Sequence, residues 1–445
     1  MHITVVNGSP KGEYSITLQT VLYIMKHHPE HTFETVHAGK IIKTLEKDMT
    51  PALDALKRAD MILFSYPVYT FLAPSQLHRF IELVKESDVD LNGKIATQIT
   101  TSKHFYDVTA HRYIRDNCAD LGMKQIRGLS ADMDDLLTEK GRQDALRFFD
   151  HVLWCTEHNI YETDAPAVSG GKCERASVPE PCAKQPGART VIVADLQEND
   201  DALRVMIDRF RAVLPMESEV VNIREFPFRG GCISCFNCAA DGTCIYKDGF
   251  DAFLREKIQT ADAIVIAFSI KDHSMGARFK LYDDRQFCNG HRTVTEGTPF
   301  GYLVHGNLSA EENLRMVIDG RAQVGGNFLA GVACDEKDPD GGIDRMARML
   351  DHAVREKYTQ PSDFLGVGGM KIFRDLIWLM QGLMRADHRF FKSHGQYDFP
   401  QKKRGTMVKM YLVGALMTNK KLRAKAGGKI NDGMIGPYKK VLEEE

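Results

Sequence analysis

The sequence predicts an α/β protein with two similar units, each a doubly wound parallel sheet of five strands, followed by a mainly helical extension. Three observations support this prediction. At 445 residues, the chain exceeds what one ordinary α/β core requires. Short apolar runs alternate with stretches of helical periodicity, the pattern of a parallel sheet covered by helices on both faces. The order of these elements in the first unit is repeated in the second, which suggests an internal duplication.

The first unit is expected to span residues 1–162. Apolar runs predict its strands at Ile3–Asn7, Phe33–His37, Met61–Ser65, Lys94–Thr100 and Lys124–Leu129. Helical spacing of apolar residues predicts helices at Ile16–Met25, Pro51–Arg58, Pro74–Val84, Ala110–Leu121 and Thr138–His158. Residues 163–188, which contain several prolines and glycines together with Cys173 and Cys182, are predicted to form a linker.

The second unit is expected to span residues 189–360. Its predicted strands are Thr190–Ala194, Glu219–Ile223, Ala263–Phe268, Phe300–Val304 and Phe328–Cys334. Its predicted helices are Ala202–Leu214, Phe250–Thr260, Ala277–Phe287, Glu311–Arg321 and Ile343–Tyr358. Residues 361–445 form a basic extension without a third α/β unit, and apolar residues recur in it at helical spacing over Met370–Arg389.

Composition indicates the environment of the protein. The hydrophobic fraction of 43% and the charged fraction of 27% are those of a soluble globular protein. The start of the chain runs directly into a strand-like segment instead of a signal peptide, and the sequence holds no apolar run of about 20 residues. Ten cysteines without secretory features indicate a reducing compartment, so we expect a cytoplasmic protein.

The charge of the chain is unevenly distributed. The extension carries 16 lysines and arginines against 8 acidic residues, whereas the whole chain has a net charge of −2. A basic tail of this kind is most simply explained by packing on the acidic body of its own protein, and contact with a membrane surface is the less favoured alternative. No nucleic-acid partner is expected.

The loops after three strands of the first unit contain the most distinctive residues. In a doubly wound sheet, ligands bind beyond the carboxyl ends of the strands, where the strand order reverses. The loop after the first strand has glycines that allow a close backbone approach, and then leads into a helix whose N-terminus favours an anion. A terminal phosphate is the expected ligand, and the candidate residues are Ser9, Lys11, Ser15, Ile16 and Thr17.

Two further loops complete this predicted site. Pro67 fixes an extended turn after the third strand and precedes Val68, Tyr69, Thr70 and Phe71, whose rings suit a flat isoalloxazine. Core packing is the alternative role for these aromatic residues, but their position at the carboxyl end of a strand favours contact with a ligand ring. Hydroxyls follow the fourth strand at Thr100, Thr101 and Ser102.

These loops resemble the NADPH-dependent FMN reductase branch of the flavodoxin-like superfamily. The resemblance rests on Gly8-Ser9-Pro10-Lys11 with Ser15 and Thr17, and on Pro67-Val68-Tyr69. Lysine stands at position 11 where the family usually has arginine. The resemblance covers residues 1 to about 160 well and residues 188 to 358 more loosely. It implies a flavodoxin-like fold, with FMN phosphate at the first loop and the isoalloxazine at the second, but it does not identify a substrate.

The second unit carries four cysteines in one short loop, with the spacing C-x₂-C-x₂-C-x₅-C, at Cys232, Cys235, Cys238 and Cys244. Four thiolates at this spacing suit one metal centre, either an iron–sulfur cluster or zinc. Within a flavodoxin-like domain the loop resembles the compact motif of iron–sulfur flavoproteins, which implies a [4Fe–4S] cluster. Zinc and free thiols are the alternatives.

The two units depart from each other in complementary ways. Several carboxylates between Asp195 and Asp201 occupy the loop where the second unit would bind a flavin phosphate, and they would repel it. The first unit has no cysteine loop after its second strand. The resemblance to iron–sulfur flavoproteins, in which the cluster of one subunit lies near the FMN of another, implies that FMN on the first unit faces the Cys232–Cys244 loop.

The expected function is that of a flavin-dependent oxidoreductase. Electrons would pass from NAD(P)H or a ferredoxin-like donor through FMN to a small organic acceptor, such as a quinone, a nitro or azo aromatic, or an activated alkene. The chain lacks a Gly-x-Gly-x-x-Gly fingerprint with a trailing acid, so NAD(P)H would stack transiently on the flavin. No catalytic acid can be assigned, and a homo-oligomer is compatible with the sequence. The alternatives are an electron-transfer flavoprotein serving other redox proteins and a redox-sensing binding protein.

Overall fold

The computed structural model describes residues 1–162 and 173–421, so that the first ten residues of the predicted linker lie outside the described part. Residues 1–162, called the first half below, form a parallel sheet in the order β2-β1-β3-β4-β5, in which β6 also pairs with β4. Its strands are β1 (His2–Asn7), β2 (Thr32–Val36), β3 (Met61–Pro67), β4 (Ile95–Ser102), β5 (Lys124–Gln125) and β6 (Leu129–Asp132). Its helices are α1 (Ile16–His27), α2 (Ala38–Leu45), α3 (Thr50–Arg58), α4 (Ser75–Lys85), α5 (Asp107–Asp120) and α6 (Glu139–Glu157).

Residues 185–360, called the second half, form a second parallel sheet in the order β11-β10-β9-β7-β8. Its strands are β7 (Gln185–Ala194), β8 (Met216–Asn222), β9 (Ala263–Ser269), β10 (Phe300–His305) and β11 (Leu329–Cys334). Its helices are α7 (Asp201–Val213), α8 (Asn237–Asp241), α9 (Phe250–Phe253), α10 (Gly276–Arg285), α11 (Glu312–Gly325) and α12 (Pro339–Glu356). Counted from its own first strand, each sheet has the order 2-1-3-4-5 of flavodoxin-like folds, so the predicted fold class is confirmed.

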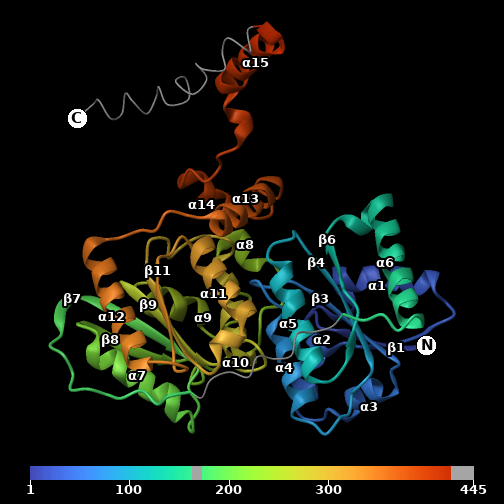
Figure 1. Cartoon of the computed structure of the whole chain (residues 1–445), viewed down its shortest axis with the longest axis horizontal. Helices are drawn as coiled ribbons and strands as arrows, with labels where there is room; N and C mark the ends of the chain where they lie inside the picture. Colours follow the sequence, from blue (N-terminus) through green and yellow to red (C-terminus); the bar gives the residue numbers. More distant parts are fainter. Residues whose placement is uncertain (163–172, 422–445) are drawn as a thin grey trace. The chain divides into compact units, whose positions relative to one another are not determined.

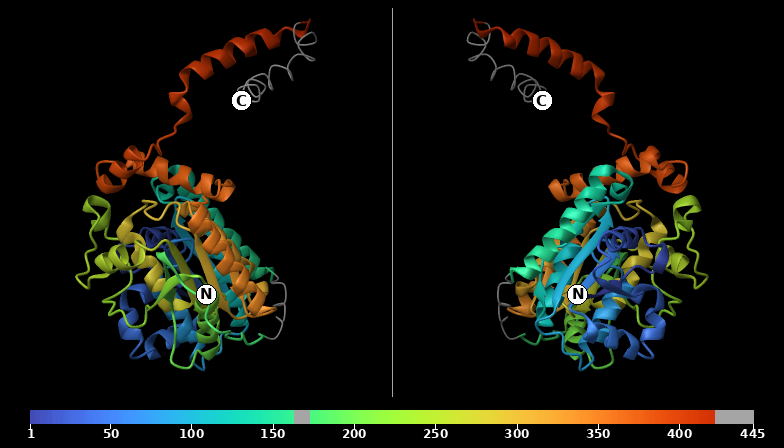
Figure 2. Two further views of the ribbon diagram at one scale, coloured as in Figure 1. Left: turned by 90° about the vertical axis from the view of Figure 1, so that its left-hand side faces the viewer. Right: turned by 90° about the vertical axis from the view of Figure 1, so that its right-hand side faces the viewer.

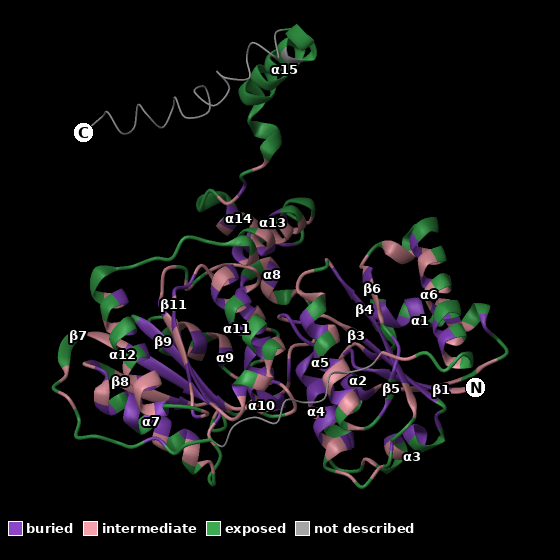
Figure 3. Cartoon of the chain, viewed as in Figure 1, coloured by how far each residue is buried: buried purple, intermediate pink, exposed green. Residues whose placement is uncertain are grey.

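Helices cover both faces of each sheet (Figures 1 and 2). In the first half, α1 and α6 enclose one core, and in the second half α7 and α12 enclose another. The opposite faces share a third, continuous core, because α4 of the first half packs on α10 of the second and α5 packs on α11. Figure 3 shows the central strands β3, β4 and β9 as largely buried. The two halves are therefore joined through a common hydrophobic core.

Four local predictions need correction. The predicted fifth strand is split into β5 and β6. The short helix α2 was missed, because its eight residues are fewer than the roughly 11–18 over which helical periodicity is read. The predicted helix Phe250–Thr260 is α9 followed by one π-helical turn, Leu254–Ile258. The predicted stretch Met370–Arg389 starts earlier, at α13 (Phe364–Leu379), because the Asp363 side chain caps that helix, and it breaks before α14 (Arg385–Ser393).

Beyond residue 389, the chain forms a separate unit containing α15 (Arg404–Thr418), described here by itself. Large apolar side chains of α15 are exposed, and they include Tyr411 and Leu412. None of the helices in the described ranges has the length and apolar character needed to cross a membrane.

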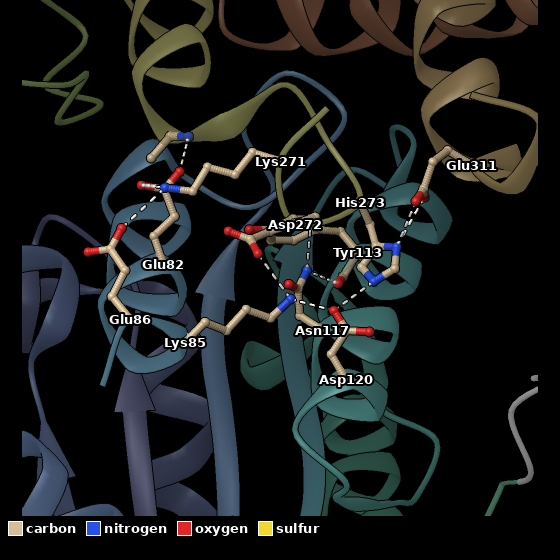
Figure 4. Close-up of polar contacts among 11 residues, drawn as sticks. Glu82, Lys85, Glu86, Tyr113, Asn117, Asp120, Lys271, Asp272, His273 and Glu311 are labelled. Carbon is tan, nitrogen blue, oxygen red and sulfur yellow. Dashed lines mark hydrogen bonds and ion pairs between the residues drawn. The ribbon is translucent and has the colours of Figure 1, made fainter. Parts of the chain in front are cut away.

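A loop of the second half contacts α4 and α5 of the first half through charged groups (Figure 4). His273 Nε2 lies 2.9 Å from Asp120 Oδ2, and His273 Nδ1 lies 3.0 Å from Glu311 Oε1. These two hydrogen bonds outweigh partial burial and raise the pKa of His273 to about 10. Beside it, Lys85 Nζ lies 3.1 Å from Asp272 Oδ1. A protonated His273 therefore bridges a carboxylate of each half.

Candidate functional site

A cavity of about 430 Å³ lies where the two halves meet, within the size range of small-molecule and cofactor sites. Residues of the first half line it from the loops after β1, β3 and β4, and the second half contributes the four-cysteine loop, α10 and α11. Helix α13 adds apolar side chains, among them Phe373. Of the seventeen residues predicted to hold a cofactor or a metal, all except Thr100 line this one cavity.

The loop after β1 is arranged as an anion site. Ser15 caps α1, its Oγ accepting a hydrogen bond from Leu18 N at 3.4 Å, so the helix N-terminus lies at the cavity wall. Thr17 Oγ1 lies 2.6 Å from Thr101 Oγ1 and ties this loop to the end of β4. The backbone passes close to α4 at Gly8, where a Cβ would lie 2.6 Å from Leu77 Cδ2. Hydroxyls, a helix N-terminus and the nearby Lys11 suit a phosphate.

The loop after β3 makes a tight turn. Tyr69 and Leu72 exchange backbone hydrogen bonds of 2.8 and 3.0 Å, and Thr70 and Phe71 adopt left-handed φ angles of 41° and 72°. Such conformations are strained for residues other than glycine and persist only where surrounding contacts hold them. The turn brings the rings of Tyr69 and Phe71 to the cavity wall.

Side chains of α10 in the second half hold this turn in place. Lys280 Nζ, which is fully buried, donates to Tyr69 O and to Thr70 Oγ1, both at 3.0 Å, and pairs closely with Asp284. The Asp284 carboxylate in turn accepts from Thr70 Oγ1 at 2.9 Å and from Ser75 N at 2.7 Å. Burial raises the pKa of Asp284, and Lys280 opposes that rise. The second half therefore helps to shape a loop of the first half.

The hydroxyl groups at the end of β4 do not all face the cavity. Thr101 and Ser102 line the cavity, whereas the Thr100 side chain lies 2.8 Å from His111 Nε2 and does not. Burial lowers the pKa of His111 to about 4, so the ring is neutral at pH 7. Successive side chains of a strand point to opposite faces, which separates Thr100 from Thr101. Ser102 is the last residue of β4 and reaches the cavity from the strand end.

The four-cysteine loop is packed against the first half at the cavity. Gln76 Nε2 donates to Cys232 O at 3.3 Å, and Lys11 Nζ lies 5.5 Å from the centroid of the Phe236 ring. Burial raises the pKa of the Cys232 thiol and raises that of Cys238 to about 11. Two donors point at sulfurs of the loop: Ser234 N lies 3.4 Å from Cys232 Sγ, and Arg285 Nη2 lies 3.8 Å from Cys244 Sγ.

The four cysteines offer thiolate ligands to one cavity. In the described ranges, no three of their sulfurs lie within 4.8 Å of one another. Thiolates bind zinc as well as iron–sulfur clusters, and N–H donors such as those of Ser234 and Arg285 support bound sulfur in either case. The residues present therefore fit both kinds of metal centre.

The structure brings further groups to the cavity that the sequence did not single out. His291 lines it, with Nδ1 at 3.1 Å from Oδ2 of the buried Asp387, and Asp387 comes from α14, far away in the sequence. Lys103 also lines it, and Lys280 supports its wall from behind. A helical segment after the second half was the only sequence signal for Asp387, and Lys280 had none beyond its place on a predicted helix.

The equivalent loop of the second half is filled by its own side chains. Asp195 pairs with Arg224 at 2.6 Å, and Asp200 accepts a hydrogen bond from Ser269 Oγ at 2.7 Å. These carboxylates occupy the place where the first half offers hydroxyls and a lysine. Because Arg224 pairs with Asp195, the expected repulsion of a phosphate at this loop stays a prediction.

Comparisons with known proteins support the fold. A family model described as a flavodoxin-like fold matches residues 1–151. A comparison with curated proteins gave no match. Among solved structures, an NADPH-quinone reductase from P. pentosaceus is 15% identical, with 34% of this chain and 97% of that chain covered and a TM-score of 0.29. An NAD(P)H:quinone oxidoreductase from Methanothermobacter marburgensis is 13% identical, with 37% and 98% covered and a TM-score of 0.28.

An FMN-dependent NADH-azoreductase from Bacillus anthracis is 13% identical, with 36% and 99% of the two chains covered and a TM-score of 0.27. Similarities at this level carry no argument about the activity of this chain. The family match and the sheet order of the first half agree with each other. Residues 1–151 therefore have a flavodoxin-like fold.

Proposed function

We propose that this protein is a flavin-dependent oxidoreductase that binds FMN in the cavity between its two halves. One observation carries the proposal: three loops with flavin-binding features in the first half and the four-cysteine loop of the second half line the same cavity. Loops separated by about 130 residues or more in the sequence would meet at one cavity by chance only rarely. A shared redox site explains why each half has kept a different part of it.

The residues of the first loop would bind the FMN phosphate. Ser9, Ser15 and Thr17 offer hydroxyl donors, the N-terminus of α1 offers backbone N–H groups, and Lys11 adds a positive charge. The bond between Thr17 and Thr101 fixes these donors relative to the end of β4. Donors that are fixed before the ligand arrives cost little ordering entropy on binding.

The second and third loops would hold the flavin ring. Pro67, Val68 and Tyr69 form the turn beside it, and Thr101 and Ser102 offer polar contacts to its edge. The flavin supplies hydride and single-electron chemistry when bound. The apolar walls contributed by α10, α11 and α13 exclude water from this space.

The loop of Cys232, Cys235, Cys238 and Cys244 would hold a [4Fe–4S] cluster, which supplies one-electron transfer when bound. The residues around it fit this role: the four cysteines line one cavity, and Ser234 N and Arg285 donate toward two of their sulfurs. We further propose that the chain is a tandem duplicate related to iron–sulfur flavoproteins, in which a fused pair keeps one complete site.

NAD(P)H or a ferredoxin-like protein would supply the electrons, and a small organic molecule, such as a quinone or a nitro or azo aromatic, would accept them. His291 is the side chain on the cavity wall best placed to supply a proton to such an acceptor. Asp387 holds its Nδ1, which leaves Nε2 as the nitrogen for proton transfer.

The first experiment is an anaerobic ultraviolet–visible spectrum, with flavin, iron and sulfide analyses on the same purified sample. We expect one FMN and about four irons and four sulfides per chain. A sample with FMN but without iron or sulfide would contradict the proposed cluster and would still support a flavin-dependent enzyme. A protein that binds neither, even after reconstitution under anaerobic conditions, would refute the proposed function.

Two variants separate the parts of the site. Cys238→Ser is expected to lose iron and sulfide but still bind FMN. Lys11→Met is expected to bind FMN more weakly but to keep its iron. Cys155→Ser is the matched control, because Cys155 is buried in the first half and lies outside the cavity.

A further inference from the structure

Away from the FMN cavity, three side chains that can bind a metal meet at the carboxyl edge of the second sheet. Cys173 Sγ, a ring nitrogen of His305 and a carboxylate oxygen of Asp335 all lie within 4.8 Å of one another. Within residues 1–162 and 173–421, this is the one set of three such ligand atoms that lies so close together. The proposed function uses none of these residues.

The register of the second sheet places two of the three. Strands β10 and β11 are parallel, and Val304 is paired with Cys334. The next residue on each strand, His305 and Asp335, therefore emerges at the same edge. His305 Nδ1 lies 2.5 Å from Asp335 Oδ2, and Asp335 Oδ1 accepts a hydrogen bond from Gly306 N at 2.9 Å. The carboxylate is buried and its orientation is fixed.

Backbone contacts deliver Cys173 to this edge. Glu174 N donates to Asp335 O at 2.5 Å, and three residues further on Ser177 N donates to Asp340 Oδ1 at 2.9 Å. Arg209 also donates to Ser177 O, at 2.8 Å. The segment that leads from the first half into the second sheet is thus fastened across the ends of β10 and β11, with Cys173 at its beginning.

The electrostatics of the cluster do not suit a nucleophilic cysteine. An activated thiol has a lowered pKa and a base beside it. Here burial and a hydrogen bond with Asp335 raise the pKa of Cys173 to about 11. The nearby Glu336 carboxylate also disfavours ionisation of this thiol. Carboxylates beside a thiol and an imidazole suit a bound cation.

We propose that Cys173, His305 and Asp335 bind one divalent transition-metal ion, with Zn²⁺ as the best match. Thiolate, imidazole and carboxylate are the ligands that zinc takes from proteins, and three of them leave a fourth tetrahedral position for water or for Glu336. Binding releases the protons of the thiol and of the imidazole, so the affinity rises with pH. The ion ties the segment between the halves to the second sheet, and the site requires neither FMN nor a cluster.

The test measures zinc and iron per chain in protein produced with added zinc, and then zinc affinity by competition with a chromophoric chelator. The variants are Cys173→Ser, which changes an exposed residue, and His305→Ala. Cys182→Ser is the matched control, since Cys182 lies in the same connecting segment and outside the cluster. Zinc bound at the four-cysteine loop would contribute equally to all these proteins and cancels in the comparison.

We expect the wild type and Cys182→Ser to hold one zinc more per chain than Cys173→Ser and His305→Ala. Loss of a direct ligand should weaken binding by on the order of 100-fold, at least as much as loss of a supporting contact does. Circular dichroism should show that Cys173→Ser keeps the wild-type fold. Equal zinc content and equal affinity in all four proteins would overturn the proposal, and so would a wild type that takes up zinc at no site outside the four cysteines.

Discussion

The buried pair of Lys280 and Asp284 should contribute to both stability and FMN binding, and Lys280→Met tests this. Both side chains are 0% exposed, and together they anchor the Thr70 hydroxyl of the first half. Removal of one partner of a buried, hydrogen-bonded ion pair costs about 3–5 kcal/mol, because the other charge remains buried without compensation. We therefore expect the free energy of unfolding by urea to fall by about that amount.

The matched control is Lys271→Met. Lys271 also crosses between the halves, with Nζ at 3.3 Å from Glu82 Oε2, but 44% of its side chain is exposed. Exposed ion pairs contribute about 0–1 kcal/mol, so this variant should unfold close to the wild type.

Lys280→Met should also weaken FMN binding by at least about tenfold. The turn at Tyr69 and Thr70 loses two hydrogen bonds from a charged donor, each worth about 1.5–3 kcal/mol, and a tenfold change in affinity corresponds to about 1.4 kcal/mol. Quenching of flavin fluorescence measures the dissociation constant.

The pH dependence of the Lys280→Met variant gives a second readout. Without Lys280, the folded-state pKa of Asp284, already raised by burial, rises further above its unfolded value. A carboxyl whose folded-state pKa is raised loses stability as pH rises through the range between the two values, so the deficit should be larger at pH 7 than at pH 5. A Lys280→Met protein that matches Lys271→Met in stability and the wild type in FMN affinity would refute this reasoning.

Three further predictions follow from single contacts. His273→Gln should remove stability that the wild type has below pH 6.5. The wild type loses this stability as pH rises from 6.5 toward about 10, because the folded-state pKa of His273 is raised. At pH 7, the free energy of unfolding by urea should therefore fall by about 1–3 kcal/mol, discounted for partial exposure, and at pH 10 the variant and the wild type should differ little. Ser15→Ala should lower the free energy of unfolding by about 1 kcal/mol, because the helix cap is lost, and should weaken FMN binding. Ser15→Asn should restore the stability but not the FMN affinity. Thr101→Val should weaken FMN binding in the fluorescence titration, and Thr100→Val, its neighbour on the other face, should leave FMN affinity unchanged; equal effects of the two would contradict the assignment of faces.

Much of the fold was predictable because the strands and helices of an α/β protein produce local patterns of apolar residues in the sequence. The central strands β3 and β9 are continuous apolar runs, as expected for strands buried on both sides, and the predicted strands lie within a few residues of their true ends. The elements that were missed are short or irregular. Helix α2 has only eight residues, and the π-helical turn after α9 keeps an apolar spacing close to that of an α-helix.

The candidate site was predictable only in parts. Ser15 and Thr17 at the start of a helix, and Pro67 with Tyr69 after a strand, have local patterns because backbone geometry at these positions restricts the residue types. The four cysteines are also recognisable locally, from their spacing within one short loop. Each pattern identifies a loop and the chemistry that the loop offers, since both are set by residues near one another in the sequence.

What the sequence determined by itself is therefore the fold class, the loops of the first half and the cysteine loop of the second. The resemblance also led us to expect these loops at one site, and in the structure they line one cavity. Only the tertiary structure decided that Lys280 supports this cavity from the other half and that Asp387 meets His291 there. The same holds for Cys173, His305 and Asp335, which are up to 162 residues apart. Contacts between distant residues depend on how the helices of two sheets pack on a shared core, and a single sequence has no local periodicity that encodes this packing.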